Sequence, residues 1–250
     1  MTTPVIHRVT ALDLRFEPWA WPFADTRRAD IAAHFAQVQR QKPAIWNGRV
    51  LLARDVVFAQ GRLSASYFET DFASFLAWRD WGFVDRGVLN GFGMGALCCA
   101  DGAFVLGEMA QHTSNAGRVY FPSGTPDLDD IRGDTVDIAG SVARELEEET
   151  GLTPSDYHAE SGWHCVVSGA AIAMIKLLHA ECSGESLRAR IEADLARQSR
   201  PELSGDARAP WSSLRRNETR LPICASYPKT LRKEATVFAE RDAKSSGARK

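Results

Sequence analysis

The chain has 250 residues, of which 44% are hydrophobic and 25% are charged, and its formal net charge is −2 at pH 7. This balance is that of a globular protein with one large domain, or with a main domain and a smaller partner. Because the chain has no net positive charge, we expect neither a nucleic acid nor a membrane as its partner. The five cysteines show no CxxC spacing, which agrees with a reducing compartment. The N-terminus lacks the apolar core of a signal peptide, and no run reaches the roughly 18–20 apolar residues of a membrane span, so we expect a cytoplasmic protein.

The first third of the chain alternates strand and helix patterns. Residues 5–16 alternate apolar and polar positions, which predicts one strand, and residues 25–41 carry a helical apolar stripe that ends before a proline. Residues 49–69 predict two strands joined by a Gln-Gly turn. Residues 71–82 predict a short helix capped by its first aspartate. Residues 84–95 contain four glycines, which makes this segment a candidate joint between an N-terminal subdomain and the rest.

The remainder continues the alternation. A hairpin is predicted at residues 95–111 and a strand at residues 118–127, followed by a helix over residues 137–150. Two strands around a Ser-Gly turn follow in residues 158–181, and a second helix in residues 184–198. A mixed sheet with helices on both faces is the simplest way to bury these apolar faces, so we expect an α/β fold.

The segment RELEEETGL, residues 144–152, places four glutamates in five positions just before a glycine. At about 100° per residue, Glu145, Glu148 and Glu149 fall within one arc of roughly 100°, while Glu147 points to solvent. Like charges at this spacing repel each other, and acids in a last helical turn meet the negative end of the helix dipole at about 0.3–1 kcal/mol each. A solvated acidic face explains Glu147. A hard divalent cation explains the other three, since Mg²⁺ binds carboxylate oxygens.

The same segment resembles the second half of the Nudix box, G-x5-E-x7-R-E-U-x-E-E-x-G-U, in which U is aliphatic. The fixed positions are filled without a gap by Arg144, Glu145, Leu146, Glu148, Glu149, Gly151 and Leu152. The upstream FPSGTPD resembles the P-G-G turn that enters the box. The resemblance implies a Nudix-type α/β/α sandwich with a mixed β-sheet. It also implies that Glu145, Glu148 and Glu149 hold Mg²⁺ or Mn²⁺ against a diphosphate, and that Arg144 is an ion-pair partner for the loop and its acids.

The first half of the box departs from the family pattern. The family has a glutamate eight residues before the box arginine, where this chain has Val136, and a glycine fourteen residues before it, where this chain has Asp130. A longer loop accounts for both departures, and Gly124 then takes the role of the glycine, whose carbonyl is a metal ligand in the family. Asp137 or Asp134 is the candidate to replace the missing acid.

Family members add one more acid from a loop after the box, as metal ligand or base. Glu202, in the turn-rich RQSRPELSGD, is the candidate, and an ordinary surface acid is the alternative interpretation. The resemblance therefore implies a Mg²⁺-dependent pyrophosphohydrolase that cleaves a nucleoside diphosphate linked to a group X into a nucleotide and X-phosphate. Glu145 or Glu202 would orient or deprotonate the water. One of the seven tryptophans is a candidate to stack a nucleobase, although most are expected to serve packing.

The resemblance also implies a division of the chain into two parts. We expect an N-terminal α+β subdomain in residues 1–86 and a Nudix hydrolase domain in residues 87–250. The layout of the extension resembles that of Nudix enzymes that hydrolyse nucleotide sugars, so X is a sugar in one version of the hypothesis, while coenzyme A, dinucleotides and nucleoside triphosphates remain open. An extension of this size often serves dimerisation in related hydrolases, so a homodimer is expected. The departures in the box leave a second hypothesis, a Nudix-fold nucleotide-binding or regulatory module that has lost catalysis.

Overall fold

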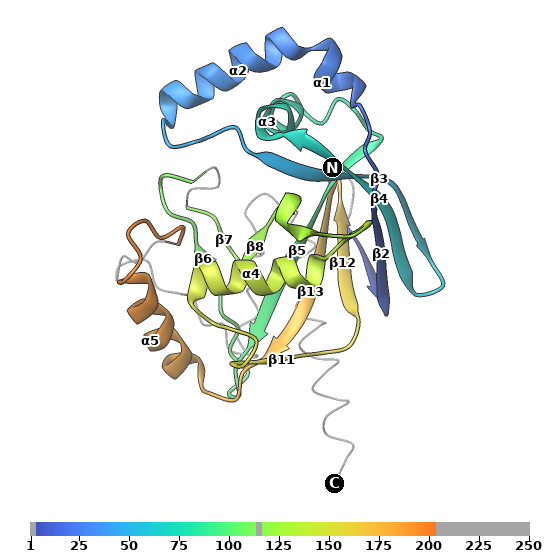
Figure 1. The fold of residues 1–250 in the computed structure, drawn as a ribbon. Coiled ribbons are helices and arrows are strands. Elements are labelled where there is room, and N and C mark those ends of the chain that lie inside the picture. Colours follow the sequence, from blue (N-terminus) through green and yellow to red (C-terminus); the bar gives the residue numbers. More distant parts are fainter. Residues whose placement is uncertain (1–3, 114–116, 204–250) are drawn as a thin grey trace.

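An 11-stranded mixed β-sheet is the framework of the computed structural model, which describes residues 4–113 and 117–203 (Figure 1). Its strands are β1 (Val5–Val9), β2 (Ala11–Phe16), β3 (Arg49–Ala59), β4 (Arg62–Asp71), β5 (Val88–Cys98), β8 (Ser123–Gly124), β9 (Ile131–Arg132), β10 (Thr135–Val136), β11 (His158–Ala159), β12 (Trp163–Ser168) and β13 (Ala171–His179). Their order is β1-β12-β13-β5-β3-β4-β2-β10-β9, with β11 beside β13 and β8 beside β5. The pairs β5–β13 and β2–β4 are parallel. The expected α/β class with a mixed sheet is confirmed.

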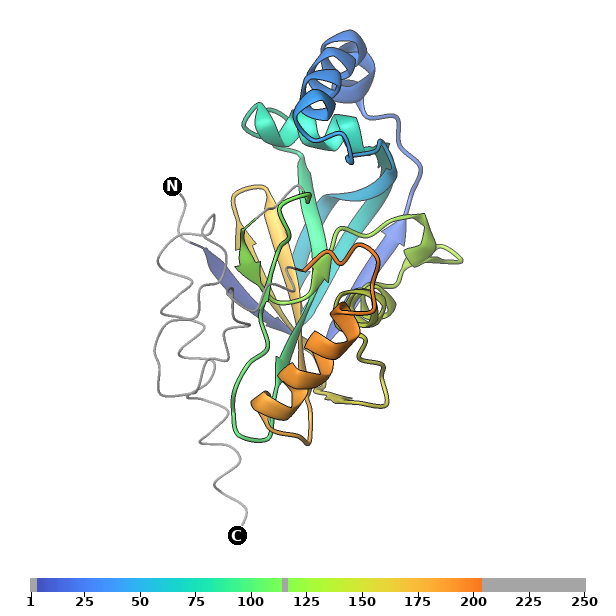
Figure 2. The same cartoon turned by 90° about the vertical axis from the view of Figure 1, so that its left-hand side faces the viewer.

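The helices gather in two places. In the described ranges they are α1 (Pro22–Thr26), α2 (Arg28–Gln41), α3 (Phe72–Asp80), the 3-10 helix η1 (Leu128–Asp130), α4 (Ile138–Thr150) and α5 (Gly184–Leu195). Figures 1 and 2 show α1, α2 and α3 at one end of the molecule, whereas α4 lies beside β5 and β8 with α5 next to it. Two short strands, β6 (Gly107–Glu108) and β7 (Val119–Tyr120), pair with each other.

None of the helices in the described residues is both long enough and apolar enough to span a membrane.

The N-terminal strand differs from its prediction. Residues 5–16 form two strands instead of one, because the chain bends at Thr10, whose backbone amide donates to the carbonyl of Gly61 at 2.7 Å. β1 pairs with β12, while β2 pairs with β4 and β10. Residues on both sides of residue 86 therefore share one sheet, and the division of the chain into two domains there remains a prediction.

The predicted helix at residues 25–41 is also divided. α1 begins earlier than predicted, at Pro22, where the fixed φ of proline suits a first helical turn. Arg27, with φ −115° and ψ 20°, separates it from α2. α2 buries Ile31 and Phe35, as its apolar stripe predicted. The next helix, α3, is capped as expected, since the side chain of Asp71 accepts from the backbone amide of Ser74 at 2.9 Å.

Most of the glycine-rich segment, residues 84–95, belongs to the central strand β5, and its role as a joint between subdomains remains a prediction. Its alternate glycines make room for neighbours on one face of the sheet. A Cβ on Gly93 would lie 2.6 Å from the side chain of Val142 in α4, and one on Gly91 would lie 2.3 Å from the hydroxyl of Tyr67. The glycines thus allow α4 to lie close to the sheet, which fixes the position of the acids that α4 carries.

The β3–β4 hairpin is buried on both faces. Leu52 and Phe68 face α1, α2 and α3 in one hydrophobic cluster, while Leu51 and Tyr67 face the larger cluster that includes β5, β13 and α4. This alternation is the two-residue period of a strand. The N-terminal extension therefore shares a hydrophobic core with the part of the chain that carries the box.

The other predicted elements agree with the structure in part. The turns at 60–61 and 168–169 join β3 to β4 and β12 to β13, and Gln60 and Gly61 both have a positive φ (50° and 70°). The predicted hairpin at residues 95–111 closes with only a single bridge, between Cys98 and Phe104, before β6 begins. The predicted strand at residues 118–127 is two short strands, β7 and β8. Residues 204–250 of the predicted Nudix domain lie outside the described residues.

Candidate active site

The helix α4 carries the candidate site, and its ends are those that the sequence predicted. The side chain of Asp137 accepts from the backbone amide of Gly140 at 2.9 Å and caps the N-terminus. Gly151 ends the helix in the left-handed conformation, with φ 69°. Val142 and Leu146 are buried against the sheet. The face beside this apolar stripe holds the acids of the box.

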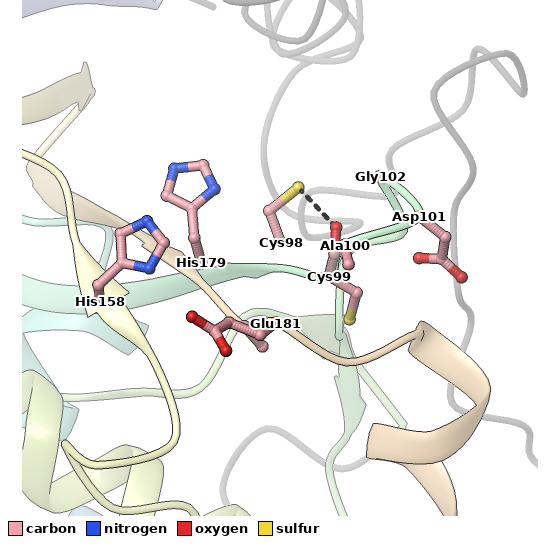
Figure 3. A pocket seen from close by; sticks show the side chains of 9 residues that line it. Cys98, Cys99, Ala100, Asp101, Gly102, His158, His179 and Glu181 are labelled. Carbon is pink, nitrogen blue, oxygen red and sulfur yellow. Dashed lines mark hydrogen bonds between the residues drawn. The ribbon is translucent and has the colours of Figure 1, made fainter.

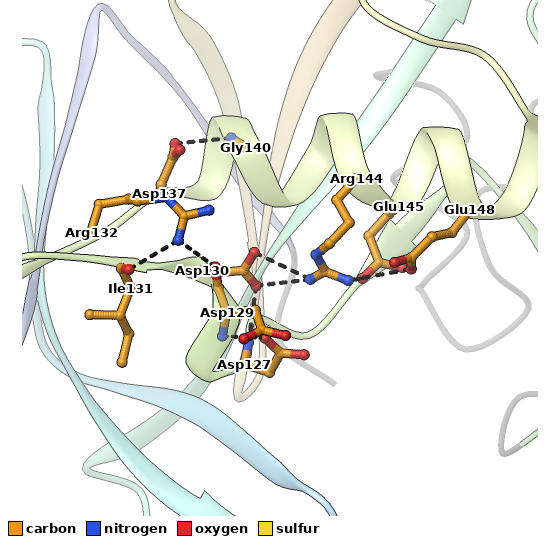
Figure 4. A network of polar contacts seen from close by, with 10 residues as sticks. All are labelled: Asp127, Asp129, Asp130, Ile131, Arg132, Asp137, Gly140, Arg144, Glu145 and Glu148. Atoms are coloured by element: carbon orange, nitrogen blue, oxygen red, sulfur yellow. Dashed lines mark hydrogen bonds and ion pairs between the residues drawn. The ribbon is translucent and has the colours of Figure 1, made fainter.

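Arg144 connects α4 to the loop before it (Figure 4). Its Nη2 donates to both carboxylate oxygens of Asp130, at 3.2 and 3.0 Å. Its Nη1 lies 3.0 Å from Oε1 of Glu145 and 3.4 Å from Oε2 of Glu148. A single guanidinium therefore contacts one acid of the loop and two acids of the helix.

The acid that meets Arg144 is Asp130, so the expectation that Asp134 or Asp137 fills this place is wrong. Asp134 pairs with Arg15 at 2.8 Å, and Asp137 caps α4. Asp130 is 2% exposed and also accepts from the backbone amide of Asp127, in a reciprocal capping arrangement around η1. The sequence pattern missed it because it stands where the family has a glycine. The D-x-x-D spacing of this turn was the signal that could have identified it.

Glu145 is packed tightly against β8. Its side chain is 14% exposed, and a Cβ added to Gly124 would come within 2.1 Å of its Oε1. Burial raises the pKa of Glu145 to about 7, an effect that Arg144 opposes and that the charges of Glu148 and Glu202 reinforce. Only glycine at position 124 leaves room for this carboxylate.

Glu149 is the most unusual of the acids. It is 3% exposed, and neither of its carboxylate oxygens has a hydrogen-bond partner among the described residues. Burial raises the pKa of Glu149 well above its usual range, and the charges of Glu145 and Glu202 raise it further. The backbone of Ser123 faces the carboxyl and offsets part of this shift, but not at hydrogen-bonding geometry. A buried carboxyl group without a partner is rare in folded proteins and calls for a specific explanation.

The remaining two candidate acids lie at the open side of the cluster. The side chain of Glu148 is 59% exposed. Glu202 follows α5, and its backbone carbonyl accepts from the amide of Ala110 at 2.8 Å. Its carboxylate is close enough for its charge to raise the pKa values of both Glu145 and Glu149. The fold thus brings Glu202 to the helix acids across a long separation in sequence.

These acids do not form a closed metal centre. Within residues 4–113 and 117–203, no three His, Cys, Asp or Glu side chains are close enough together to hold an ion. Arg144 also offsets part of the charge of Glu145 and Glu148. Repulsion among the helix acids is therefore weaker than the spacing of the glutamates in the sequence indicates. The donor set nevertheless fits a hard divalent cation. It offers the buried carboxylate of Glu149, which has no hydrogen-bond partner among the described residues, and the half-buried carboxylate of Glu145, for which the missing Cβ of Gly124 leaves room.

A separate cavity of about 470 Å³ lies at the ends of β5, β11 and β13 (Figure 3). It is lined in part by His158 and His179, whose rings are stacked with centroids 5.0 Å apart. The Nε2 atom of His179 lies 3.0 Å from Oε1 of Glu160. No acid of the box lines this cavity, so it is not the candidate active site.

No family model matches the chain, and no curated protein matches it. Among solved structures, the chain is similar to a MutT protein from Methanosarcina mazei, with 16% identity and a TM-score of 0.37 over 62% of this chain and 96% of that one. It is also similar to the Nudix hydrolase RenU from M. smegmatis, with 11% identity and a TM-score of 0.33 over 62% and 84% of the two chains. A third similar structure is a mutant pyrophosphohydrolase from Bacillus subtilis, with 15% identity and a TM-score of 0.34 over 68% and 88%.

Proposed function

We propose that this chain is a pyrophosphohydrolase of the Nudix type that depends on Mg²⁺ or Mn²⁺. Its substrate would be a nucleoside diphosphate linked to a group X, and its products a nucleotide and X-phosphate. A nucleotide sugar is the first candidate for this substrate. The β3–β4 hairpin and α3 precede residues 144–152, and this order of elements resembles that of Nudix enzymes that hydrolyse nucleotide sugars. Other diphosphate-linked compounds are alternatives within the same proposal.

The observation that carries the proposal is the buried carboxyl group of Glu149, which has no hydrogen-bond partner in the part of the chain that the structure describes. Moving an ionised group out of water costs several kcal/mol unless a partner compensates it. A solvated acidic face is no explanation for a side chain that is 3% exposed. Such groups occur mainly where a ligand completes the site, and the neighbouring acids make a cation the ligand of matching charge.

Four groups would hold the cation: the carboxylates of Glu145, Glu148 and Glu149 and the backbone carbonyl of Gly124. A bound Mg²⁺ or Mn²⁺ would neutralise charge on the diphosphate, which is the main requirement of this chemistry. Arg144 keeps Glu145 and Glu148 on one side of α4 by contacting both. These contacts give Arg144 a positioning role.

Hydrolysis also requires a base. A water oxygen forms a bond to one phosphorus while the bridging P–O bond breaks, and the proton that the water loses must go to an acceptor. Two carboxylates are candidates for this acceptor. Glu202 reaches the acids from the loop after α5, and Glu145 lies on α4 itself. Separate Glu202→Gln and Glu145→Gln variants distinguish them through the pH dependence of kcat.

A second candidate function is a binding or regulatory module without catalysis. The contacts of Arg144 with Glu145 and Glu148 favour it, because two of the four ligand groups already have an ion-pair partner. A module of this kind would bind the nucleotide and leave the diphosphate intact.

Turnover with a panel of substrates separates the two functions. The full chain is incubated with MgCl₂ and UDP-glucose, ADP-ribose, coenzyme A, a dinucleotide or a nucleoside triphosphate, and the phosphate groups exposed by cleavage are measured. We expect turnover of at least one compound and its loss by about 100-fold or more in Glu149→Gln, because the cation that would stabilise transition-state charge loses a ligand.

Glu147→Gln is the matched control, since Glu147 lies on the same helix turn but faces solvent. It should keep full turnover. Equal turnover in Glu149→Gln and the unmodified chain would contradict the proposed metal site. Tight nucleotide binding without any turnover would establish the second function instead. The expected homodimer remains a prediction, which sedimentation of the full chain tests directly.

A further inference from the structure

The segment between α2 and β3, residues 42–48, is attached at one end beside the candidate site. The backbone amide of Leu51, near the start of β3, donates to the carbonyl of Pro126 at 2.7 Å. Pro126 follows Gly124 by two residues, and Gly124 lies against Glu145. The β3 end of the segment is therefore held next to the side of the acidic cluster formed by β8.

The α2 end of the segment is attached to the loop that follows β6. The Nζ of Lys42 donates to the backbone carbonyl of Thr113 at 2.7 Å. Thr113 follows Ala110 by three residues, and Ala110 donates to the backbone of Glu202. The segment is thus held at Lys42 by residues 110–113, whose first residue bonds to the backbone of Glu202, and just past its other end by Pro126. Figure 1 shows the segment between α2 and β3 on the side of the molecule where β6, β7 and β8 lie.

Trp46 stands in the middle of this segment with 76% of its surface exposed. The backbone around it is fixed: the carbonyl of Ile45 accepts from a glutamine side chain of α2 at 3.0 Å, and Oδ1 of Asn47 accepts from a backbone amide in the first turn of α3 at 2.7 Å. A Cβ on Gly48 would come within 2.9 Å of the indole ring. The ring therefore rests on Gly48, on a rigid support, and leaves most of its surface free.

We propose that Trp46 is the platform on which the base of the nucleotide stacks. This inference depends on the proposed function, because the phosphates of the same nucleotide would bind at the helix acids. Exposure alone does not select Trp46, since single exposed apolar side chains are common. Trp46 is selected by its position on the segment that Lys42 and Leu51 attach to the neighbouring loops, and by its aromatic ring. Among the exposed large hydrophobic side chains of the described residues, it is the aromatic one. An aromatic ring recognises the flat face of any base and binds it without a specific hydrogen-bond pattern.

Equilibrium binding of nucleoside monophosphates tests this role separately from catalysis, because these compounds contain no diphosphate to cleave. AMP, GMP, CMP and UMP are titrated into the full chain in MgCl₂ by calorimetry, and ribose 5-phosphate serves as the base-free probe. We expect the unmodified chain to bind at least one monophosphate more tightly than ribose 5-phosphate. Trp46→Ala should weaken that binding about tenfold, and Trp46→Phe, which keeps an aromatic face, should retain it within about threefold.

Val57→Ala is the matched control, because Val57 is a 54% exposed apolar residue at the far end of β3. It should bind like the unmodified chain, and ribose 5-phosphate should bind equally to all variants. Two results overturn the inference: Trp46→Ala binds the monophosphate as tightly as the unmodified chain, or the unmodified chain binds no monophosphate better than ribose 5-phosphate. If monophosphate binding depends on Trp46 and no diphosphate is cleaved, the inference stands and the proposed hydrolase fails.

Discussion

Asp130 and Glu149 are carboxyl groups buried to the same depth, 2% and 3% exposed, in opposite surroundings. Asp130 accepts two hydrogen bonds from Arg144 and one from the backbone of Asp127. Glu149 accepts none within the described residues. Within the described residues, the fold thus supplies hydrogen-bond donors to one buried acid and none at hydrogen-bonding geometry to the other.

This difference separates a structural acid from a candidate ligand. In a buried ion pair with several hydrogen bonds, each charge is compensated by its partner. Removal of one partner leaves the other charge buried and uncompensated, which lowers the free energy of unfolding. A buried carboxyl group without partners gives the folded chain no such stabilisation. A bound cation would compensate the charge of such a carboxyl group and would explain why it is buried. The two residues should therefore respond to substitution in opposite ways.

The largest effect is expected on stability in Asp130→Asn. This change keeps the shape of the side chain but leaves the guanidinium of Arg144 without its buried carboxylate, which costs about 3 kcal/mol. The free energy of unfolding in urea measures the loss. Glu149→Gln, in the absence of divalent ions, should lose no stability. A larger loss in Glu149→Gln than in Asp130→Asn would reverse the comparison.

A smaller effect is expected in Gly124→Ala. The new Cβ would meet the carboxylate of Glu145 at 2.1 Å, so either β8 or Glu145 must move. Such overpacking costs about 1–3 kcal/mol, and displacement of Glu145 should also weaken Mg²⁺-dependent turnover. Gly87→Ala is the control, since its nearest neighbour would lie 3.4 Å away. Thermal unfolding of the two variants should differ, and equal melting temperatures would show that position 124 tolerates a side chain.

The smallest effect is expected in Asp156→Asn. Asp156 also has a partner, Arg190 at 2.7 Å, but the pair lies at the surface. The hydrogen bond from Arg190 lowers the pKa of Asp156, so the pair stabilises the fold above the usual pKa of aspartate, and this stability is lost as the pH falls below about 4. The variant should lose less than about 1 kcal/mol at pH 7 and nothing at low pH. Unfolding in urea at both pH values checks this, and a loss that persists at low pH would contradict it.

The elements predicted correctly from the sequence are those whose signals are local. The helix expected over residues 137–150 is α4, which ends before Gly151, and the signals that predicted it lie on the helix itself. Glu202 was chosen from a loop that follows a helix, and the fold does bring it near the helix acids.

The features that were missed depend on packing between distant segments. Asp130 meets Arg144 only because η1 and the β9–β10 hairpin turn the longer loop back toward α4. The glycines of residues 84–95 gave no strand signal, yet residues 88–98 form β5, in which the close approach of Val142 requires Gly93. Thr10 divides the N-terminal strand because its amide bonds to Gly61, which no local pattern indicates. In each case the reason lies in a contact that exists only after folding.

Uptake of Mg²⁺ measured by calorimetry on the unmodified chain and on Glu149→Gln is the most direct test of the comparison between the two buried acids. The unmodified chain and Glu147→Gln should bind Mg²⁺, and Glu149→Gln should bind it at least about tenfold more weakly. Equal uptake by Glu149→Gln and the unmodified chain, or no uptake by the unmodified chain, would contradict the assignment of Glu149 as a metal ligand.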